Sequence, residues 1–141
     1  MNDSQKRTEH PKSVAYGGLP PEQAEKALIM LHGRGGSAED ILSLADYLAV
    51  KDFSLIAPRA SNHTWYPYSF LAPPPANEPW LGAALLMLGE VVQDAREAGI
   101  KDENLYLLGF SQGACLALEF AARNATRLGG VVAFTGGLIG D

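Results

Sequence analysis

Cysteine and clustered basic residues are scarce in this sequence of 141 residues, and each scarcity excludes a class of protein. The single cysteine, Cys115, cannot form a disulfide within the chain, so nothing indicates an oxidising compartment. Acidic residues outnumber basic ones by 16 to 11, the formal net charge is −5, and no Lys/Arg cluster interrupts that balance. A surface for nucleic acid or for an anionic membrane therefore lacks electrostatic support.

Long hydrophobic runs are absent as well. The first seven residues are polar, unlike the start of a secretory signal peptide. The longest apolar stretch, near residues 80–92, is interrupted by Gly82, Gly89 and Glu90 and is too short to span a bilayer. We therefore expect a cytoplasmic protein that does not insert stably into a membrane.

The remaining composition is that of a globular domain. Hydrophobic residues make up 47% of the chain and charged residues 19%, which argues against a disordered protein. A chain of this length buries roughly 68–70% of its unfolded surface, enough for one substantial core. We expect residues 1–141 to form a single domain, with residues 1–12 as a flexible tail.

Short apolar runs separated by helical patterns predict a parallel sheet. Buried strands are predicted at residues 26–31, 53–57, 104–108 and 131–134, with an additional early strand around residues 13–16. Because strands and helices alternate, the predicted fold class is α/β, with a mainly parallel sheet and helices on both faces.

Three helices are predicted between these strands. Ser37 opens the first, with Asp40 three residues on, and the apolar spacing continues to Ala49. The second is predicted to be capped by Asn77 and to stop near Ala98, before a glycine; the third ends near residue 124.

A proline-rich segment, residues 58–79, separates the second strand from the second helix. Its six prolines predict that no regular element forms there. Long loops of this kind often line binding sites. The aromatic side chains of Trp65, Tyr66 and Tyr68 lie in this segment, where they either clasp the loop to the body or contact substrate.

Residues 109–113 read Gly-Phe-Ser-Gln-Gly, a G-x-S-x-G motif between a predicted strand and a predicted helix. This is the setting of a nucleophile elbow, a strained turn that exposes the serine hydroxyl. Gly109 and Gly113 fit where a Cβ is crowded, and the backbone N–H of Gln112 faces the oxyanion that forms when Ser111 attacks an acyl carbon. The alternative is a chance match in a chain with 15 glycines.

A second oxyanion donor is expected from the loop after an earlier strand. Residues 32–35, His-Gly-Arg-Gly, follow the first predicted strand, and the backbone N–H of Arg34 is the candidate. His32 is interpreted as a structural residue that fixes this loop by hydrogen bonds, rather than as the general base.

The same loop also fits a dinucleotide-binding pattern. Gly33, Gly35 and Ala38 match G-x-G-x-x-A after a strand and before a helix. That pattern requires an acidic residue at the end of the second strand, where this chain has Ala-Pro-Arg-Ala at residues 57–60. Arg59 is able to meet a 2′-phosphate, so the alternative stays open, although it leaves the G-x-S-x-G motif unexplained.

From about residue 27 onward the chain resembles the phospholipase/carboxylesterase family of α/β-hydrolases, which includes bacterial carboxylesterases and acyl-protein thioesterases. The resemblance rests on His-Gly at 32–33, Ala-Pro-Arg-Ala at 57–60, Trp-Tyr at 65–66, the motif at 109–113 and residues 135–140. It implies a Ser–Asp–His triad, no metal and no cofactor. It also implies Ser111 as nucleophile, Gln112 and Arg34 as oxyanion donors, and Trp65 and Tyr66 in the acyl pocket.

The sequence departs from this family in one respect. In α/β-hydrolases an acid and then a histidine follow the nucleophile. No histidine follows Ser111; the three histidines, His10, His32 and His63, all precede it. The chain is therefore expected to lack about the C-terminal third of the fold, and to be a fragment, to be complemented by another polypeptide, or to be a shortened, inactive relative.

The predicted function is hydrolysis of short-chain carboxylic esters, thioesters or lysophospholipid-like substrates through an acyl-enzyme on Ser111. The alternative from a different class is a ligand-binding relative that has lost the triad acid and base. A small-molecule ester is the expected partner, with either a homo-oligomer or a complementing fragment as a protein partner. Cys115 is interpreted as a small core residue.

Overall fold

The computed structural model describes residues 10–124 and 127–134. Within them, five strands form one sheet in the order β1-β3-β2-β4-β5. Their bounds are β1 Val14–Gly18, β2 Lys26–Leu31, β3 Phe53–Pro58, β4 Leu105–Phe110 and β5 Gly130–Phe134. All neighbouring strands are parallel except β1, which pairs with β3 in the antiparallel direction. The mainly parallel sheet and all five predicted strands are confirmed.

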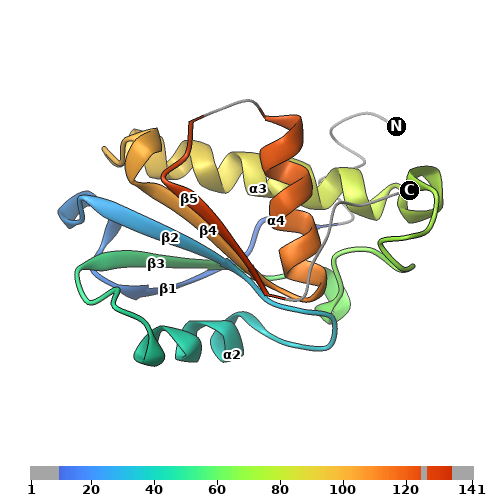
Figure 1. Ribbon diagram of the computed structural model, residues 1–141, viewed down its shortest axis with the longest axis horizontal. Coiled ribbons are helices and arrows are strands. Elements are labelled where there is room, and N and C mark those ends of the chain that lie inside the picture. Colours follow the sequence, from blue (N-terminus) through green and yellow to red (C-terminus); the bar gives the residue numbers. More distant parts are fainter. Residues whose placement is uncertain (1–9, 125–126, 135–141) are drawn as a thin grey trace.

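Helices cover both faces of the sheet, as predicted. Figure 1 shows α3 and α4 on one face and α2 on the other. The bounds of these helices are α2 Ala38–Ser43, α3 Trp80–Glu97 and α4 Gln112–Arg123. The larger buried apolar cluster lies between the sheet and the α3–α4 layer, and a smaller one lies beneath α2.

The first helix is shorter than its apolar pattern predicts. Ser37 caps it as expected, its hydroxyl accepting from the N–H of Asp40 at 3.1 Å. The α-helix ends at Ser43, whose hydroxyl donates back to the carbonyl of Asp40, and the backbone continues as a 3-10 turn over Leu44–Tyr47. Serine back-bonding of this kind competes with helical hydrogen bonds, so the prediction of a helix to Ala49 is wrong.

The start of α3 also differs from the prediction. Asn77 does not cap this helix, because its side chain is fully buried and holds the preceding loop. Its Oδ1 accepts from the N–H of Tyr68 at 2.8 Å, and its Nδ2 donates to the carbonyl of Ser69. The carboxylate of Glu78 instead accepts from the N–H of Gly82 at 2.5 Å.

The proline-rich segment is more regular than predicted. It contains 3-10 turns at Ser61–His63 and Pro74–Asn77, so the prediction that no regular element forms there is wrong. A 3-10 turn needs only one or two i→i+3 hydrogen bonds, which proline at its first position does not prevent.

Part of the predicted flexible tail is packed onto the body. His10 is 2% exposed; its Nε2 donates to the carbonyl of Trp65 at 2.7 Å and its Nδ1 accepts from the N–H of Ser61 at 3.1 Å. Lys12 forms an ion pair with Asp94 of α3. The prediction is therefore wrong for residues 10–12, and residues 1–9 lie outside the described residues.

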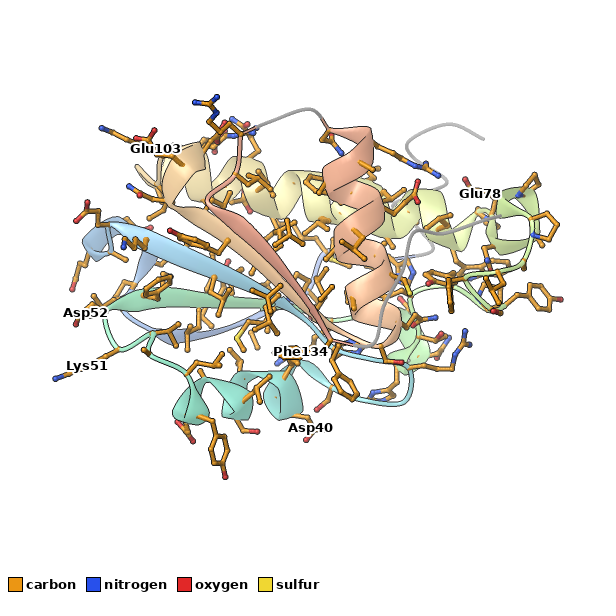
Figure 2. All side chains as sticks on the ribbon, in the orientation of Figure 1. Asp40, Lys51, Asp52, Glu78, Glu103 and Phe134 are labelled. Atoms are coloured by element: carbon orange, nitrogen blue, oxygen red, sulfur yellow. The ribbon has the colours of Figure 1, made fainter. Side chains whose placement is uncertain are left out.

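The carboxyl ends of β2, β4 and β5 meet at one edge of the sheet, next to the first turn of α4. Figure 2 shows Phe134 at this edge, whereas Lys51, Asp52 and Glu103 lie at the opposite one. The loops that follow β2 and β4 therefore meet here, and this edge is where open α/β sheets bind ligands. In the described part of the chain, no helix has the length and apolar character needed to cross a bilayer.

Candidate active site

Ser111 occupies a sharp corner between β4 and α4. Its backbone has φ 55° and ψ −113°, a conformation that non-glycine residues rarely adopt and that costs about 1–3 kcal/mol. The Ser111 N–H donates to the carbonyl of Phe134 at 2.8 Å, which ties the corner to the end of β5. The residue is exposed, and α4 begins immediately after it at Gln112. The predicted strand–turn–helix geometry is therefore present.

The two glycines of the motif are required by contacts with backbone atoms. A Cβ on Gly109 would lie 2.2 Å from the carbonyl oxygen of Gly113. A Cβ on Gly113 would lie 2.1 Å from the carbonyl oxygen of Leu31 and 2.6 Å from that of His32. The first turn of α4 thus lies so close to Gly109 at the end of β4, and to the end of β2, that neither glycine position admits a side chain, as the motif predicts.

Two backbone N–H groups are available beside Ser111. As the first residue of α4, Gln112 has an N–H with no acceptor within the helix. Within residues 10–124 and 127–134, the N–H of Arg34 donates to no acceptor either. Arg34, Ser111 and Gln112 line one pocket, so the structure brings the three predicted residues together. Their role as an oxyanion hole remains a prediction.

This pocket has a volume of about 270 Å³ and opens beside Ser111. Its wall is formed by the loop after β2, by the corner, by the start of α4 and by the loop before α3. The lining residues are Arg34, Tyr66, Ser69, Phe70, Ser111, Gln112 and Cys115. Arg34 supplies the one charge among these lining residues. A pocket of this size holds a small acyl group.

The side chain of Gln112 holds the pocket loop, a role that the sequence did not predict. Its Oε1 accepts from the N–H of Trp65 at 2.8 Å, and its Nε2 donates to the carbonyl of Tyr66 at 2.8 Å and to the hydroxyl of Thr64 at 3.1 Å. Gln112 is 6% exposed, so these bonds are shielded from water. Gln112 therefore lines the pocket and also fixes the loop that carries Tyr66 with its side chain.

The structure separates the two aromatic residues predicted to contact substrate. Tyr66 lines the pocket, whereas Trp65 is not among the lining residues. Trp65 is 1% exposed, and its indole N–H donates to the carbonyl of His32 at 2.9 Å. Trp65 therefore anchors the loop from beneath. The guanidinium of Arg34 fixes the same loop from outside by donating to the carbonyls of Pro67 and Tyr68, each at 3.0 Å.

His32 is a structural residue, as interpreted from the sequence. Its Nδ1 donates to the carbonyl of Gly33 at 2.8 Å, and its Nε2 accepts from the N–H of Ala60 at 3.1 Å. The ring stacks on Trp65 with a centroid distance of 5.0 Å. Burial lowers the pKa of His32 below its ordinary value, because the protonated ring would lose solvation in this position. The neutral ring is therefore the form that fits these bonds.

No histidine among the described residues hydrogen-bonds to Ser111. His10 and His32 use both ring nitrogens in the bonds given above. The Nδ1 of His63 donates to the carbonyl of Gly36 at 2.8 Å, which braces the loop after β2. Among the described residues, Ser111 therefore has two backbone amides near it but no histidine in contact with its hydroxyl.

Two further kinds of site are a dinucleotide site and a metal site. Arg59, which in a dinucleotide site would contact a 2′-phosphate, forms an ion pair with Glu39 at 2.6 Å. Within the described ranges, no group of three or more His, Cys, Asp or Glu side chains is placed to hold a metal ion.

Comparison with known proteins matches this chain to one family. The family model described as Phospholipase/Carboxylesterase matches residues 19–140. The curated acyl-protein thioesterase 1 of Kluyveromyces lactis is 29% identical over 132 residues, which cover 82% of this chain and 58% of that protein.

Solved structures agree with this match. The phospholipase/carboxylesterase of Dyadobacter fermentans is 52% identical with a TM-score of 0.91, over 93% of this chain and 63% of that one. Esterase PE8, 23% identical with a TM-score of 0.74 over 91% of this chain and 65% of that one, supports the fold alone. The chain therefore spans 58–65% of the length of these three relatives.

Adding a methyl group at Gly113, next to the corner, is expected to lower the free energy of unfolding far more than adding one at Gly89 in α3. Gly113→Ala places a Cβ against two carbonyl oxygens, so we expect the free energy of unfolding to fall by about 3 kcal/mol or more in urea denaturation. Gly89→Ala in α3 is the matched control. Its Cβ would come no closer than 3.9 Å to Phe120, and a gain of about 0.5–1 kcal/mol is expected. A Gly113→Ala variant as stable as the wild type would contradict the close approach.

Removing the Gln112 side chain is expected to release the pocket loop. Gln112→Ala leaves the backbone groups of Trp65 and Tyr66 without their partner, so the free energy of unfolding should fall by about 2–3 kcal/mol. The exposed Gln93→Ala variant of α3 should change it by less than about 0.5 kcal/mol. Equal effects of the two substitutions in urea denaturation would show that the Gln112 bonds do not hold the loop.

Acidification is expected to destabilise the fold through His32. The pKa of His32 in the folded state lies below its unfolded value of 6.5, so the unfolded state binds more protons as the pH falls. The free energy of unfolding is therefore highest above about pH 6.5. It decreases as the pH falls from there through the folded-state pKa of His32. Asp40 and Glu39 oppose this shift and His63 adds to it. Urea denaturation between pH 7.5 and 5.5 should give a smaller pH slope for His32→Gln than for the exposed control His63→Gln. An imidazole titration by NMR with a His32 midpoint at or above 6.5 would exclude the mechanism.

Proposed function

Because the chain belongs to the phospholipase/carboxylesterase family and has the α/β-hydrolase fold, we propose that it carries the nucleophile of a serine hydrolase of carboxylic esters. The observation that carries this proposal is the position of Ser111. It lies at a strained corner, with the N–H groups of Gln112 and Arg34 free beside it in one pocket. A corner that is strained and over-determined by glycine contacts is typical of a functional residue.

The proposed reaction forms an acyl-enzyme. The Ser111 Oγ bonds to the carbonyl carbon and loses its proton to a base, while the carbonyl oxygen becomes an oxyanion that accepts from the Gln112 and Arg34 N–H groups. The alcohol or thiol then leaves with a proton. Water attacks the acyl carbon in turn, and the carboxylic acid is released. Short-chain esters, thioesters and lysophospholipid-like molecules are the proposed substrates.

A serine hydroxyl is a weak nucleophile without an adjacent base. No histidine follows Ser111 in the sequence, and the three histidines that precede it have the structural contacts described above. We propose that the triad acid and base come from polypeptide outside these 141 residues, either in the same protein or in a complementing fragment. The 141-residue chain by itself is then a poor catalyst.

The second candidate function is a ligand-binding relative without catalysis. The observation in its favour is that, among the described residues, the pocket is formed while no base contacts Ser111. For either candidate we propose a cytoplasmic location and a small-molecule ester as ligand, with no nucleic-acid partner. We also propose that the protein self-associates into a homo-oligomer.

A chimera tests the proposed catalysis. The chain is fused after residue 141 to the part of the Dyadobacter fermentans protein that follows the matched region, and hydrolysis of p-nitrophenyl butyrate is compared for the chain and the chimera. We expect turnover in the chimera and at least about 10³-fold loss of kcat on Ser111→Ala, because the acyl-enzyme cannot form. Ser61→Ala, outside the pocket, is the matched control.

The outcomes separate the two candidates. Turnover in the chimera that survives Ser111→Ala would refute the nucleophile assignment. A folded chimera that binds ligand in the pocket but shows no turnover, while the complete Dyadobacter fermentans protein is active, would favour the non-catalytic relative.

A further inference from the structure

The guanidinium of Arg34 has no carboxylate partner among the described residues. Arg59, Arg96 and Arg123 each form an ion pair with a carboxylate. The guanidinium of Arg34 instead donates to two neutral backbone carbonyls, so the protein does not neutralise its positive charge. Arg34 is exposed and lines the pocket of Ser111, so a ligand in that pocket is able to contact it.

The two carbonyls fix this guanidinium in place without using all of its donors. Its Nη1 donates to the carbonyl of Pro67 and its Nη2 to that of Tyr68, each at 3.0 Å. A guanidinium has five N–H donors in a rigid, planar fork, so most of them remain for a ligand. Because the side chain is already held, binding an anion would cost little further side-chain entropy.

The Arg34 side chain extends from the corner to the pocket loop. At its backbone end, the chain passes close to Ser111, since a Cβ on Gly33 would lie 3.5 Å from the Ser111 Cβ. At its other end, the guanidinium bonds to residues 67 and 68, which lie between the pocket-lining residues Tyr66 and Ser69 in the chain. The charge therefore lies within one arginine side chain of the position where the acyl carbonyl would bind.

The other polar groups of the pocket also suit an anion. None of the described residues that line it is Asp or Glu, although the chain has a formal net charge of −5. The Ser69 hydroxyl accepts from the N–H of Leu71 at 3.1 Å and keeps its own hydrogen for another acceptor. A bound anion would therefore meet a cation and a hydroxyl donor, and no like charge among the lining residues.

We propose that this pocket takes acyl groups that end in a carboxylate, and that the Arg34 guanidinium binds this carboxylate. The substrate class is then short monoesters or monothioesters of dicarboxylic acids, rather than esters of plain hydrocarbon acids. The planar fork of arginine matches the two oxygens of a carboxylate. The inference rests on the proposed function, because it treats the pocket as the acyl site.

Binding of two unreactive amides tests this proposal without catalysis. Pentanamide and 5-amino-5-oxopentanoate have equal numbers of carbons and differ only at the far end, where a carboxylate replaces a methyl group. Their dissociation constants for the 141-residue chain are measured by NMR titration. The preference for the anion is the pentanamide constant divided by the 5-amino-5-oxopentanoate constant. Because this preference is compared between variants, differences in ligand hydration cancel.

The preference is measured for the wild type, Arg34→Gln and Arg59→Gln. Arg59→Gln is the matched control, because Arg59 follows β3 at the same edge of the sheet but does not line the pocket. We expect Arg34→Gln to lower the preference by about 5- to 30-fold, the size of one charge-assisted pair at a partly exposed site. Arg59→Gln should leave it nearly unchanged, and the affinity of Arg34→Gln for pentanamide should stay close to that of the wild type.

Salt gives a second measurement that needs no variant. In the wild type, the preference for 5-amino-5-oxopentanoate should fall as the NaCl concentration is raised from about 0.01 M to about 0.3 M, because salt screens the attraction between the two charges. This result is expected even if Arg34→Gln weakens the loop that carries Pro67 and Tyr68.

A preference that is equal in the wild type and Arg34→Gln, or that does not respond to salt, would overturn the proposal. An equal loss of affinity for both amides in Arg34→Gln would do so too, because Arg34 would then only hold the loop. Glycerol 3-phosphate is the third ligand. If its binding depends on Arg34 and that of 5-amino-5-oxopentanoate does not, the anion belongs to the leaving group of a lysophospholipid-like ester and the acyl assignment is wrong.

This test and the test of catalysis fail separately. Neither amide reacts with Ser111, so the preference is independent of whether the chimera hydrolyses an ester. Failure of both amides to perturb the resonances of the pocket residues would refute the acyl site itself.

Discussion

The site depends on one close approach between backbones, the first turn of α4 against the carboxyl end of β2. Gly113 lies so near the carbonyl oxygens of Leu31 and His32 that no side chain fits between them. This contact, together with Gly109 against Gly113, leaves Ser111 in a conformation with positive φ. The local strain is sustained because the parallel pairing of β2 with β4 places the carboxyl ends of these two strands side by side.

A partly buried polar network then holds the loop that closes the pocket. The Gln112 amide bonds to the backbone of residues 65–66 and to the hydroxyl of Thr64. The guanidinium of Arg34 bonds to the backbone of residues 67–68, and Asn77 bonds to that of residues 68–69. Such a network is favourable only when each member is paired, because a half-satisfied buried group is costly. Within the described residues, the buried hydroxyls of Tyr66 and Ser54 have no hydrogen-bond partner, whereas Gln112 satisfies the carbonyl of Tyr66.

Features with a local cause were predictable from the sequence, and features created by tertiary contact were not. The strands, the corner at Ser111 and the requirement for Gly109 follow from short patterns whose physical reason lies within the same segment. Gly113 is the exception, because the motif predicts it although its physical reason is the close approach to the end of β2. Asparagine is a residue type that often caps helices, but Asn77 is buried against residues 68–69 and holds that loop by hydrogen bonds instead. The side chain of Gln112 occupies a variable position of the motif, so nothing local indicates that it holds a loop 46–48 residues away.

We propose that the hydroxyl of Ser111 is the nucleophile presented by this corner. Treatment of the chimera with an alkyl fluorophosphonate, followed by peptide mass spectrometry, tests this assignment. We expect one phosphonyl adduct per chain, on Ser111, appearing in step with the loss of esterase activity. An adduct on another serine, or loss of activity with Ser111 unmodified, would contradict it.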